Sequence, residues 1–350
     1  MSFKRLDPED FVVSIDSLTG TVWTNGGPTL ASFFTSSVQA AGSSGNFYLS
    51  VYGTSSSNPG AEVEFDIVYA DSLGSGSALY NNAVTSSSPT RTMYGSYRSL
   101  ILEDENANFI FGSSATLGYN ACGTLITSST AVLGDHFWVL SLERARYKQQ
   151  FFAGSLNLQV SASNGLVHLT DNSRDLTANT FIGGTRVFQL VSGSNGSGIA
   201  NNGGYTPNSG SYGMVFPDLG LIMLNPYALS ESIHLAPSRS SDSDGLNTQK
   251  MYNAISLGAS FTLNSEETIS SDYVFIRARN GEFNYSENPS FISGSTGEVI
   301  YPNFINAPQT YITTVGMYND ANELVAVAKM SRPLLKDFTK EALVRVKLDF

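Results

Sequence analysis

The chain has 350 residues, which is enough for one large core or for two or three modules. Charged residues make up 14% of it, against a usual share of about 25%, and uncharged polar residues and glycine fill the difference. The net charge of −11 argues against a general nucleic-acid-binding surface, because phosphate contacts need clustered Lys and Arg.

The chain has one cysteine, Cys122, which excludes an intrachain disulfide and a zinc site built from cysteine pairs. The first residues contain no apolar signal region, and no run reaches the ~18 apolar residues of a transmembrane helix. We therefore expect a protein that does not enter a membrane and that is made and assembled in the cytoplasm.

Residues 1–17 are expected to form an N-terminal arm. Pro8 lies among acidic residues, which is typical of a helix start, because proline fits the first turn and acids favour the positive end of the helix dipole. Phe11, Val12 and Val13 then form a short apolar patch. Two alternatives stay open, namely one helical turn that leads into a strand and an arm that docks on a neighbour.

Residues 18–235 are predicted to form a β-rich domain, since apolar side chains alternate along several short runs. In residues 61–69, Val63, Phe65 and Ile67 alternate with three acids. This pattern predicts a strand with one apolar face and one acidic, solvated face.

Three other segments interrupt the alternation. Residues 92–102 permit either a helical turn or a strand. Residues 192–204 are rich in Gly, Ser and Asn and predict a long loop that is functional or mobile. Residues 236–258 are expected to be a polar linker followed by a short helix at about 246–257.

Residues 259–350 are predicted to form a C-terminal β domain organised around a hairpin. Alternating residues indicate one strand at 311–317 and a return strand at 324–329. Residues 319–322, Asn-Asp-Ala-Asn, supply the turn, because short Asx side chains cap their own backbone. Pro333 is expected to end the return strand, since proline cannot donate to a β ladder.

The last residues are predicted to contain a short helix at about 333–342 and a final strand at 344–350. A terminal strand needs a sheet edge to receive it, either in its own chain or in a neighbour's. Together these segments predict an all-β fold of sandwich-like or barrel-like modules, mostly antiparallel, with a few short helices.

No chemistry-bearing constellation stands out. The three histidines, His136, His168 and His234, lack a second histidine or carboxylate at metal-ligand spacing. A glycosidase needs two facing carboxylates, and nothing in the sequence places any two of the acid clusters at 103–105, 242–244 and 266–267 together. We therefore expect no catalytic residue, no metal site and no cofactor.

Residues 309–329 carry Thr-Thr-Val-Gly-Met-Tyr-Asn, a short turn and Leu-Val-Ala-Val-Ala-Lys. This pattern resembles one that recurs in tail-fibre and baseplate-associated proteins of tailed bacteriophages. Residues 275–291 and 331–350 are similar to virion structural proteins of large contractile-tailed phages, and residues 3–11 and 142–148 extend the similarity more thinly. The resemblance implies a particle component and no particular chemistry.

The expected function is a non-enzymatic structural component of a tailed-phage virion, in the tail or baseplate. It would assemble with other virion proteins, and as a homo-oligomer, through β-edge and apolar contacts. Two alternatives stay open, namely a head decoration or neck structural protein and a receptor-binding or glycan-binding fibre-associated protein. A free sugar-binding module is a weaker alternative.

Candidate interface residues come from two features, the basic pairs and the apolar terminal segments. In a chain with so few charges, paired arginines favour an acidic patch on a partner, although an ordinary solvated face also explains them. The candidates are Phe3, Arg5, Phe11, Arg144, Arg146, Lys148, Arg277, Arg279, Val344, Val346, Leu348 and Phe350.

Overall fold

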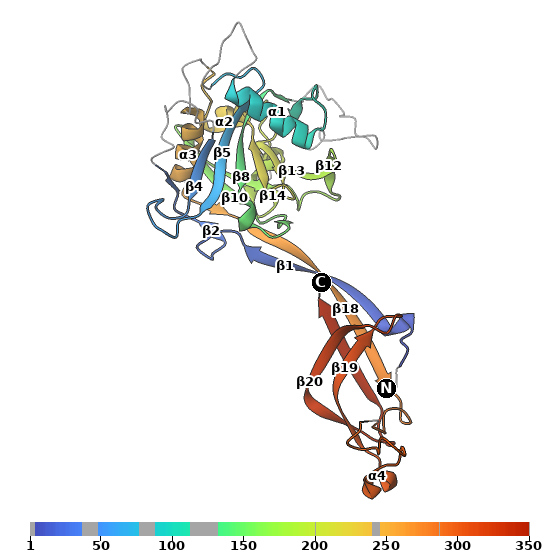
Figure 1. The fold of residues 1–350 in the computed structure, drawn as a ribbon. Coiled ribbons are helices and arrows are strands. Elements are labelled where there is room, and N and C mark those ends of the chain that lie inside the picture. Colours follow the sequence, from blue (N-terminus) through green and yellow to red (C-terminus); the bar gives the residue numbers. More distant parts are fainter. Residues whose placement is uncertain are drawn as a thin grey trace. The chain divides into compact units, whose positions relative to one another are not determined.

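The computed structural model describes residues 4–36, 48–76, 88–112, 132–199, 201–239, 246–286 and 288–349 of the chain. The chain divides into two compact units (Figure 1). The larger unit is Leu18–Glu267, and the smaller unit combines Met1–Ser17 with Thr268–Phe350. The chain therefore passes between the units twice, once within β1 (Phe11–Thr21) and once within β18 (Asn264–Ala278).

These boundaries differ from the expected domains in two places. Residues 236–258, expected to be a linker with a helix, belong to the larger unit together with residues 259–267. Residues 1–17, expected to be a separate arm, belong to the same unit as the C-terminal β region. Locally, η1 (Pro8–Asp10) is one 3-10 turn that leads directly into β1.

The larger unit is built on one long sheet whose paired strands are antiparallel. The strands, in sheet order, are β2 (Thr29–Leu30), β17 (Phe261–Thr262), β10 (Asn157–Ala162), β11 (Gly165–Asp171), β13 (Thr185–Ser194), β15 (Gly213–Phe216), β16 (Leu221–Leu224), β8 (His136–Leu142), β5 (Val63–Asp71), β4 (Tyr48–Tyr52) and β3 (Phe34–Thr35). The predicted class, all-β and mostly antiparallel with short helices, is confirmed.

Shorter elements complete this unit. They are β6 (Phe109–Phe111), β7 (Val132–Gly134), β9 (Gln150–Phe151), β12 (Thr180–Ile182), β14 (Ser197–Gly198), η3 (Arg144–Arg146), η4 (Asn201–Gly204), α1 (Pro89–Ile101), α2 (Pro226–Ile233) and α3 (Leu246–Gly258). The helix predicted at 246–257 is confirmed as α3, and residues 92–101 are helical, within α1. The segment predicted as a long loop at 192–204 contains the end of β13, β14 and η4.

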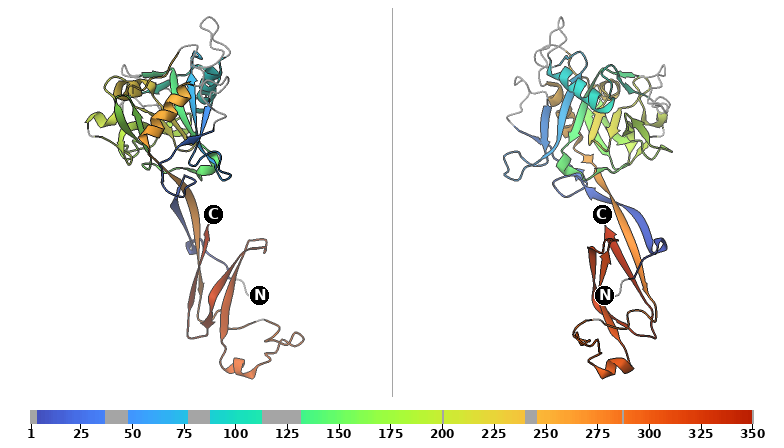
Figure 2. Two further views of the ribbon diagram at one scale, coloured as in Figure 1. Left: turned by 90° about the vertical axis from the view of Figure 1, so that its left-hand side faces the viewer. Right: turned by 45° about the vertical axis from the view of Figure 1, so that its right-hand side comes forward.

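Helices cover both faces of the sheet (Figures 1 and 2). On one face, Ile67 and Trp138 pack in a hydrophobic cluster with residues of α2 and α3. On the other face, Phe137 and Val139 pack with Tyr94 and other residues of α1. The central strands are therefore apolar on both sides, because each side meets a helix.

The acidic, solvated face predicted for residues 61–69 is wrong for Glu64 and for the half-buried Asp66, whereas Glu62 is exposed as expected. Glu64 is fully buried, and its carboxylate accepts hydrogen bonds from the backbone N–H of Thr24, at 3.2 and 3.3 Å, and from the Thr24 hydroxyl. Burial raises the pKa of Glu64, against the lowering effect of these hydrogen bonds. The prediction failed because β5 lies inside the sheet and contacts helices on both sides.

The smaller unit has two sheets among its described residues. In the first, β18 lies between β1 and β21 (Ala342–Asp349). The pairing of β18 with β21 runs from Ser271↔Asp349 to Ala278↔Ala342, so the final strand is received by its own chain on one side. The second sheet is the hairpin of β19 (Thr310–Tyr318) and β20 (Leu324–Lys336) (Figure 2).

The hairpin confirms the predicted turn but corrects the predicted end of its return strand. The side-chain Oδ1 of Asn319 accepts from the N–H groups of Ala321 and Glu323, at 3.0 and 2.8 Å. Pro333 does not end the return strand, which continues to Lys336. Residues 330–333 bulge opposite Thr313, a position that needs no ladder N–H from proline.

The short helix predicted at 333–342 is also wrong. Leu334 and Leu335 pair with Ile312 and Tyr311 in the hairpin, so strand pairing overrides the helical spacing of the apolar residues. The helix of this unit in the described residues is α4 (Pro302–Asn306).

A buried lysine joins the end of β20 to the loop after β18. The Nζ of Lys336, which is 0% exposed, donates to Asn280 O at 3.1 Å, to Asn284 Oδ1 at 2.7 Å and to Asp337 O at 3.0 Å. Three acceptors match the three N–H groups of an ammonium, so the buried charge is fully hydrogen-bonded.

Candidate functional site

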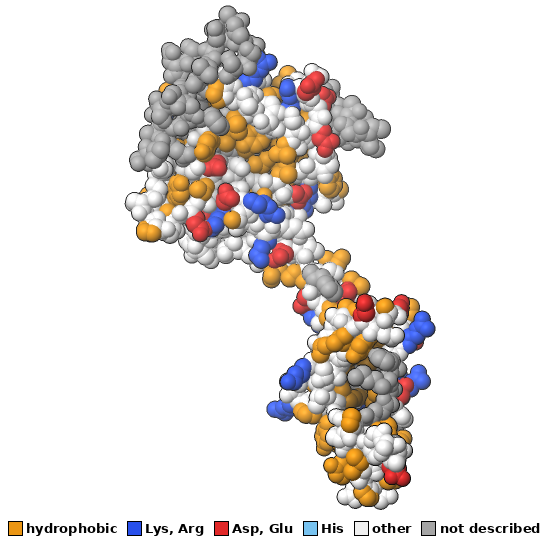
Figure 3. Space-filling view, viewed as in Figure 1, with side chains coloured by type: hydrophobic (Ala, Val, Ile, Leu, Met, Phe, Trp, Pro, Cys, Tyr) orange, Lys and Arg blue, Asp and Glu red, His pale blue; other side chains and the backbone are white. Residues whose placement is uncertain are grey.

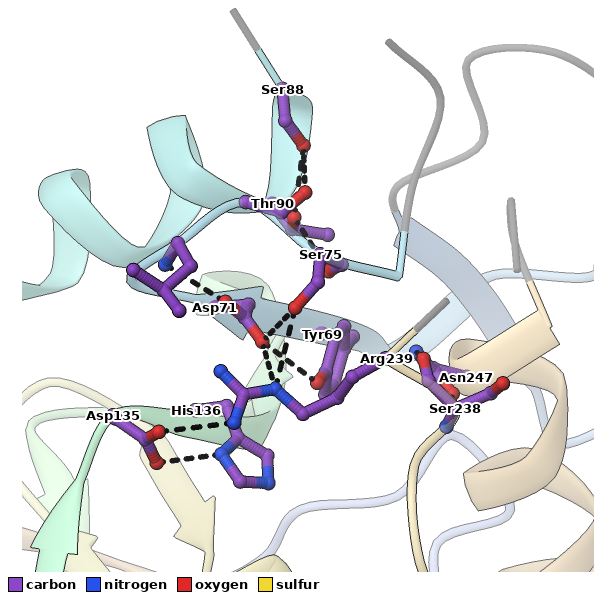
Figure 4. Close-up of polar contacts among 12 residues, drawn as sticks. Tyr69, Asp71, Ser75, Ser88, Thr90, Asp135, His136, Ser238, Arg239 and Asn247 are labelled. Carbon is purple, nitrogen blue, oxygen red and sulfur yellow. Dashed lines mark hydrogen bonds and ion pairs between the residues drawn. The ribbon is translucent and has the colours of Figure 1, made fainter. Parts of the chain in front are cut away.

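One candidate site is a polar network at the end of β5 in the larger unit (Figure 4). Asp71, the last residue of β5, is fully buried. Its Oδ2 accepts from Arg239 Nε at 2.8 Å and from Ser75 Oγ at 2.6 Å, and its Oδ1 accepts from Leu73 N at 2.8 Å. The aspartate thus caps the turn after its own strand and holds an arginine that is far away in sequence.

A second carboxylate, Asp135, completes the network. Its Oδ2 lies 3.1 Å from Arg239 Nη1, and its Oδ1 lies 2.7 Å from His136 Nδ1 and accepts from the hydroxyl of Tyr227 at 2.9 Å. Burial alone would raise the pKa of Asp135. The hydrogen bond and charge of His136, the hydrogen bond from Tyr227 and the charge of Arg239 outweigh it and lower that pKa to about 2.

Local sequence places these groups. His136 begins β8, and Tyr227 follows Pro226 at the start of α2, where Asn225 Oδ1 accepts from Tyr227 N at 3.0 Å. Next to Arg239, the backbone of Ser238 exchanges two hydrogen bonds with the side chain of Asn247 in α3, at 2.7 and 2.8 Å. The network therefore ties β5, β8, α2 and α3 together.

The chemistry of this network is that of a structural ion cluster. His136 is 4% exposed, and its ring packs edge-on against Tyr227, with centroids 5.0 Å apart. The Arg239 guanidinium is shared between two carboxylates, whose negative charge raises its pKa despite burial. In the part of the chain that the structure describes, no group of three or more His, Cys, Asp or Glu residues could hold a metal ion.

A second feature of the larger unit is a shallow hollow of about 550 Å³ beside η4. It is lined by Ser192, Ile199, Asn202, Gly204, Tyr205, Pro207 and Tyr212. The Tyr205 hydroxyl donates to Gln189 Oε1 and accepts from Asn172 Nδ2 at 3.3 Å. Burial raises the pKa of Tyr205 to about 12, so the phenol stays neutral. The two hydrogen bonds of its hydroxyl hold the ring in place at the hollow.

The third feature is the apolar surface of the smaller unit, seen as orange atoms in Figure 3. Its large exposed apolar side chains include Phe11, Val12, Val13, Ile15, Tyr285, Ile300, Tyr301, Ile305, Tyr311, Tyr318, Leu324, Val325, Val327, Phe338 and Leu343. The buried apolar residues of this unit, within the described ranges, are Val274, Ala278, Ala342 and Val346. The two hydrophobic clusters lie wholly in the larger unit.

This imbalance is concentrated on two elements. Along β1, Val13 is 64% and Ile15 is 71% exposed. On the hairpin, Val325 is 68% and Val327 is 58% exposed, whereas Ala326 and Ala328, which point the other way, are half-buried. Large apolar side chains therefore lie at the surface of both elements.

The predicted interface residues of the larger unit are engaged within it. Arg144 Nη1 donates to the carbonyl oxygens of Tyr147 and Lys148, at 3.0 and 2.6 Å. Arg146 pairs with Glu62, and Lys148 Nζ lies 3.4 Å from Glu267. The basic run thus caps its own turn and pairs with nearby acids.

The predicted residues of the smaller unit differ among themselves. Arg277 pairs with Glu341 at 2.7 Å, and Arg5 and Arg279 are exposed. Phe11 is exposed on β1. The β21 candidates Val344, Val346 and Leu348 lie on the inner side of their strand, where Val346 is buried. Phe3 and Phe350 lie outside the described residues, as does Cys122.

Sequence reasoning noted Val12 and Val13 as part of an apolar patch but left them out of the candidate interface residues, and it missed Ile15, although the signal was present. Residues 11–15 are apolar at four of five positions, so apolar side chains point to both faces of an edge strand. It also missed the pair of Asp135 and His136, which are adjacent in the sequence.

Within the described ranges, the helices are too short or too polar to cross a membrane. In comparisons with known proteins, no protein-family model, curated protein or solved structure matches this chain.

Proposed function

We propose that this chain is a non-enzymatic structural component of a tailed-phage virion, in the tail or baseplate, and that the smaller unit joins it to its neighbours. The observation that carries the proposal is the exposed apolar surface of that unit, together with the absence of a cluster of buried hydrophobic residues among its described residues. Large exposed apolar patches mark interaction sites, because burying apolar surface against a partner lowers the free energy.

The virion assignment rests on sequence resemblance. The hairpin residues 309–329 resemble those of tail-fibre and baseplate-associated proteins, and the same hairpin carries exposed Val325 and Val327. The polar network supports a structural role, because its side chains bind one another and are packed among β5, β8, α2 and α3.

The test is a quantitative one on particles. Purified virions of the phage that encodes this chain are analysed by mass spectrometry, and the chain is expected at a fixed copy number per particle. Deletion of the smaller unit is expected to abolish incorporation while the larger unit still folds, as tryptophan fluorescence would show, because Trp23 and Trp138 both lie in the larger unit. Absence of the chain from purified particles contradicts the proposal.

Glycan or receptor binding is a second candidate, favoured by the hollow lined by Tyr205 and Asn202, because aromatic rings and amides suit sugars. A glycan array probed with the full chain tests it, and Tyr205→Ala is expected to abolish any binding. Hydrolysis by the acids of β18 is disfavoured, since Glu266 accepts from Gln150 Nε2 at 2.9 Å and Glu267 faces Lys148. Binding that survives Tyr205→Ala excludes the hollow as the site.

A further inference from the structure

We propose that the free edge of β1, at residues 11–15, pairs antiparallel with the same strand of a second copy of this chain. The inference deepens the proposed function and rests on it for the premise that the smaller unit is an assembly surface. It adds which strand meets the neighbour, what that neighbour is and the symmetry of their contact.

The position of β1 in its sheet supplies the first argument. β1 is a terminal strand in the order β1-β18-β21, and among the described strands none pairs with its outer side. An edge strand presents a row of unpaired N–H and C=O groups, which is a template for another strand.

The side chains of β1 supply the second argument. Phe11, Val13 and Ile15 point to one face of the strand and Val12 to the other, and all four are 46–71% exposed. Exposed edge strands in monomers are usually blunted by lysines, prolines or bulges. β1 has no proline, and Asp16 is its one charged residue, so it lacks this protection.

The identity of the partner follows from charge and symmetry. Residues 11–15 carry no charge, so they offer a charged partner strand no ion pair, whereas two copies meet without like charges in the paired segment. An antiparallel pair of identical strands is related by a two-fold axis, and one such contact satisfies the free edges of both copies. A second copy also brings the same apolar side chains. With the two-fold axis at Val13, Val13 faces its counterpart and Phe11 faces Ile15 of the other copy.

The first experiment measures the oligomeric state of the full chain by sedimentation at roughly 1–100 µM. The wild type is expected to dimerise or to form a larger even-numbered assembly. Val13→Lys and Ile15→Lys are expected to raise the dissociation constant by at least about tenfold, because each places an ammonium group in the apolar contact between the two copies. Their monomers should keep the wild-type circular dichroism, since both side chains are exposed in one copy.

The matched control is Leu257→Lys. Leu257 lies on α3 in the larger unit and is 71% exposed, the same fraction as Ile15. This variant adds the same charge to the chain and is expected to leave the dissociation constant unchanged.

A second experiment identifies the partner as a copy. Single cysteines are placed at each of residues 11–15 in a Cys122→Ser background and oxidised. A residue close to a two-fold axis faces its own counterpart, so one or two positions are expected to give covalent dimers and the others not.

Three results would overturn the inference: a monomeric wild type at about 100 µM, an assembly that survives both lysine variants, or a failure of every cysteine position to cross-link. A monomer in solution that is nevertheless present in purified virions would reject self-pairing alone and leave the proposed function standing. Absence from virions together with a β1-dependent dimer would reject the function alone.

Discussion

The larger unit buries its apolar side chains within the chain, whereas the smaller unit leaves most of them at its surface. In the larger unit, β5 and β8 meet α1 on one face and α2 and α3 on the other. In the smaller unit, β1 and the hairpin have an exposed apolar face, and a buried lysine takes part in the interior. The larger unit is therefore stabilised by its own apolar core, whereas the described residues of the smaller unit bury few apolar side chains.

The comparison can be measured because the two tryptophans, Trp23 and Trp138, both belong to the larger unit. Tryptophan fluorescence therefore follows the unfolding of the larger unit alone. Amide hydrogen exchange of residues 268–349 follows the smaller unit, since exchange reports local opening.

The largest effect is expected for Trp138→Ala. Trp138 is fully buried between sheet and helices, and its Nε1 donates to Asn247 O at 2.9 Å. The cavity should lower the free energy of unfolding of the larger unit by about 3–5 kcal/mol. The fluorescence of Trp23 under denaturant measures this loss, and hydrogen exchange in the smaller unit should not change.

Leu166→Ala is the control, because Leu166 is exposed on the same sheet and should cost less than about 0.5 kcal/mol. Equal destabilisation of the two units by Trp138→Ala would show that they unfold together and that the smaller unit has no separate stability.

The next effect is expected for Lys336→Met in the smaller unit. The substitution leaves the buried Oδ1 of Asn284 without its donor, and a buried acceptor that loses its partner costs about 1–3 kcal/mol. The carbonyl oxygen of Asn280 keeps its hydrogen bond from Asn284 Nδ2. We expect a loss of about 2–3 kcal/mol, seen as faster exchange near residues 280–284, with unchanged tryptophan fluorescence.

Lys340→Met is the matched control. Lys340 is exposed, and its ion pair with Asp337 is long at 3.9 Å, so the substitution should have little effect. If Lys336→Met left amide hydrogen exchange near residues 280–284 unchanged, the stability of the smaller unit would not depend on this side chain.

A smaller effect concerns acid stability of the larger unit. The pKa of Asp135 is about 2 in the folded chain, below the ordinary value of about 3.9 for an unfolded aspartate. The carboxylate therefore stabilises the folded state above about pH 4, and this contribution is lost as the pH falls from about 4 to about 2. Because solvent reaches a third of the side chain, we expect a loss of about 1 kcal/mol.

Asp135→Asn isolates this term, because other carboxylates keep their own titration in both proteins. The difference in unfolding free energy between wild type and variant should shrink from pH 5 towards pH 2. A difference that stays constant over this range would mean that Asp135 carries no linked proton.

The smallest effect is expected for Asn319→Ala in the hairpin turn. The variant loses the acceptor for the N–H groups of Ala321 and Glu323, which are exposed and can bond to water instead. We expect a loss of about 0.5 kcal/mol, measured as faster exchange in β19 and β20. Asp320→Ala, which removes a neighbouring exposed acid, is the control. An effect as large as that of Lys336→Met would show that the turn, and not the buried lysine, holds the unit.

The sequence predicted those parts of the fold whose causes are local. The hairpin was found because Asn319 caps its own turn and the flanking residues alternate, and α3 was found from its apolar spacing. Pro333 and the expected helix at 333–342 were misjudged, because Leu334 and Leu335 obtain β partners from residues more than 20 positions earlier.

The parts that could not be predicted depend on contacts between distant residues. Asp71 and Arg239 are 168 positions apart, and nothing near either one indicates the other. Glu64 is buried because Thr24, 40 positions earlier, supplies its hydrogen bonds. Strand β1 shows the opposite error. Its residues 11–15 are apolar, and the sequence alone does not show that no other described part of the chain covers them.

The interior position of Lys336 also makes it a natural reporter for amine acylation. The lysines Lys148, Lys340 and Lys347 have side chains exposed by 45–70%, whereas the amine of Lys336 is shielded and fully hydrogen-bonded. A water-soluble acylating reagent should therefore modify Lys336 only when the end of β20 separates from the loop at residues 280–284. The labelling rate at this one lysine then records how often the smaller unit opens, and a slower rate inside a completed particle would show that assembly keeps it closed.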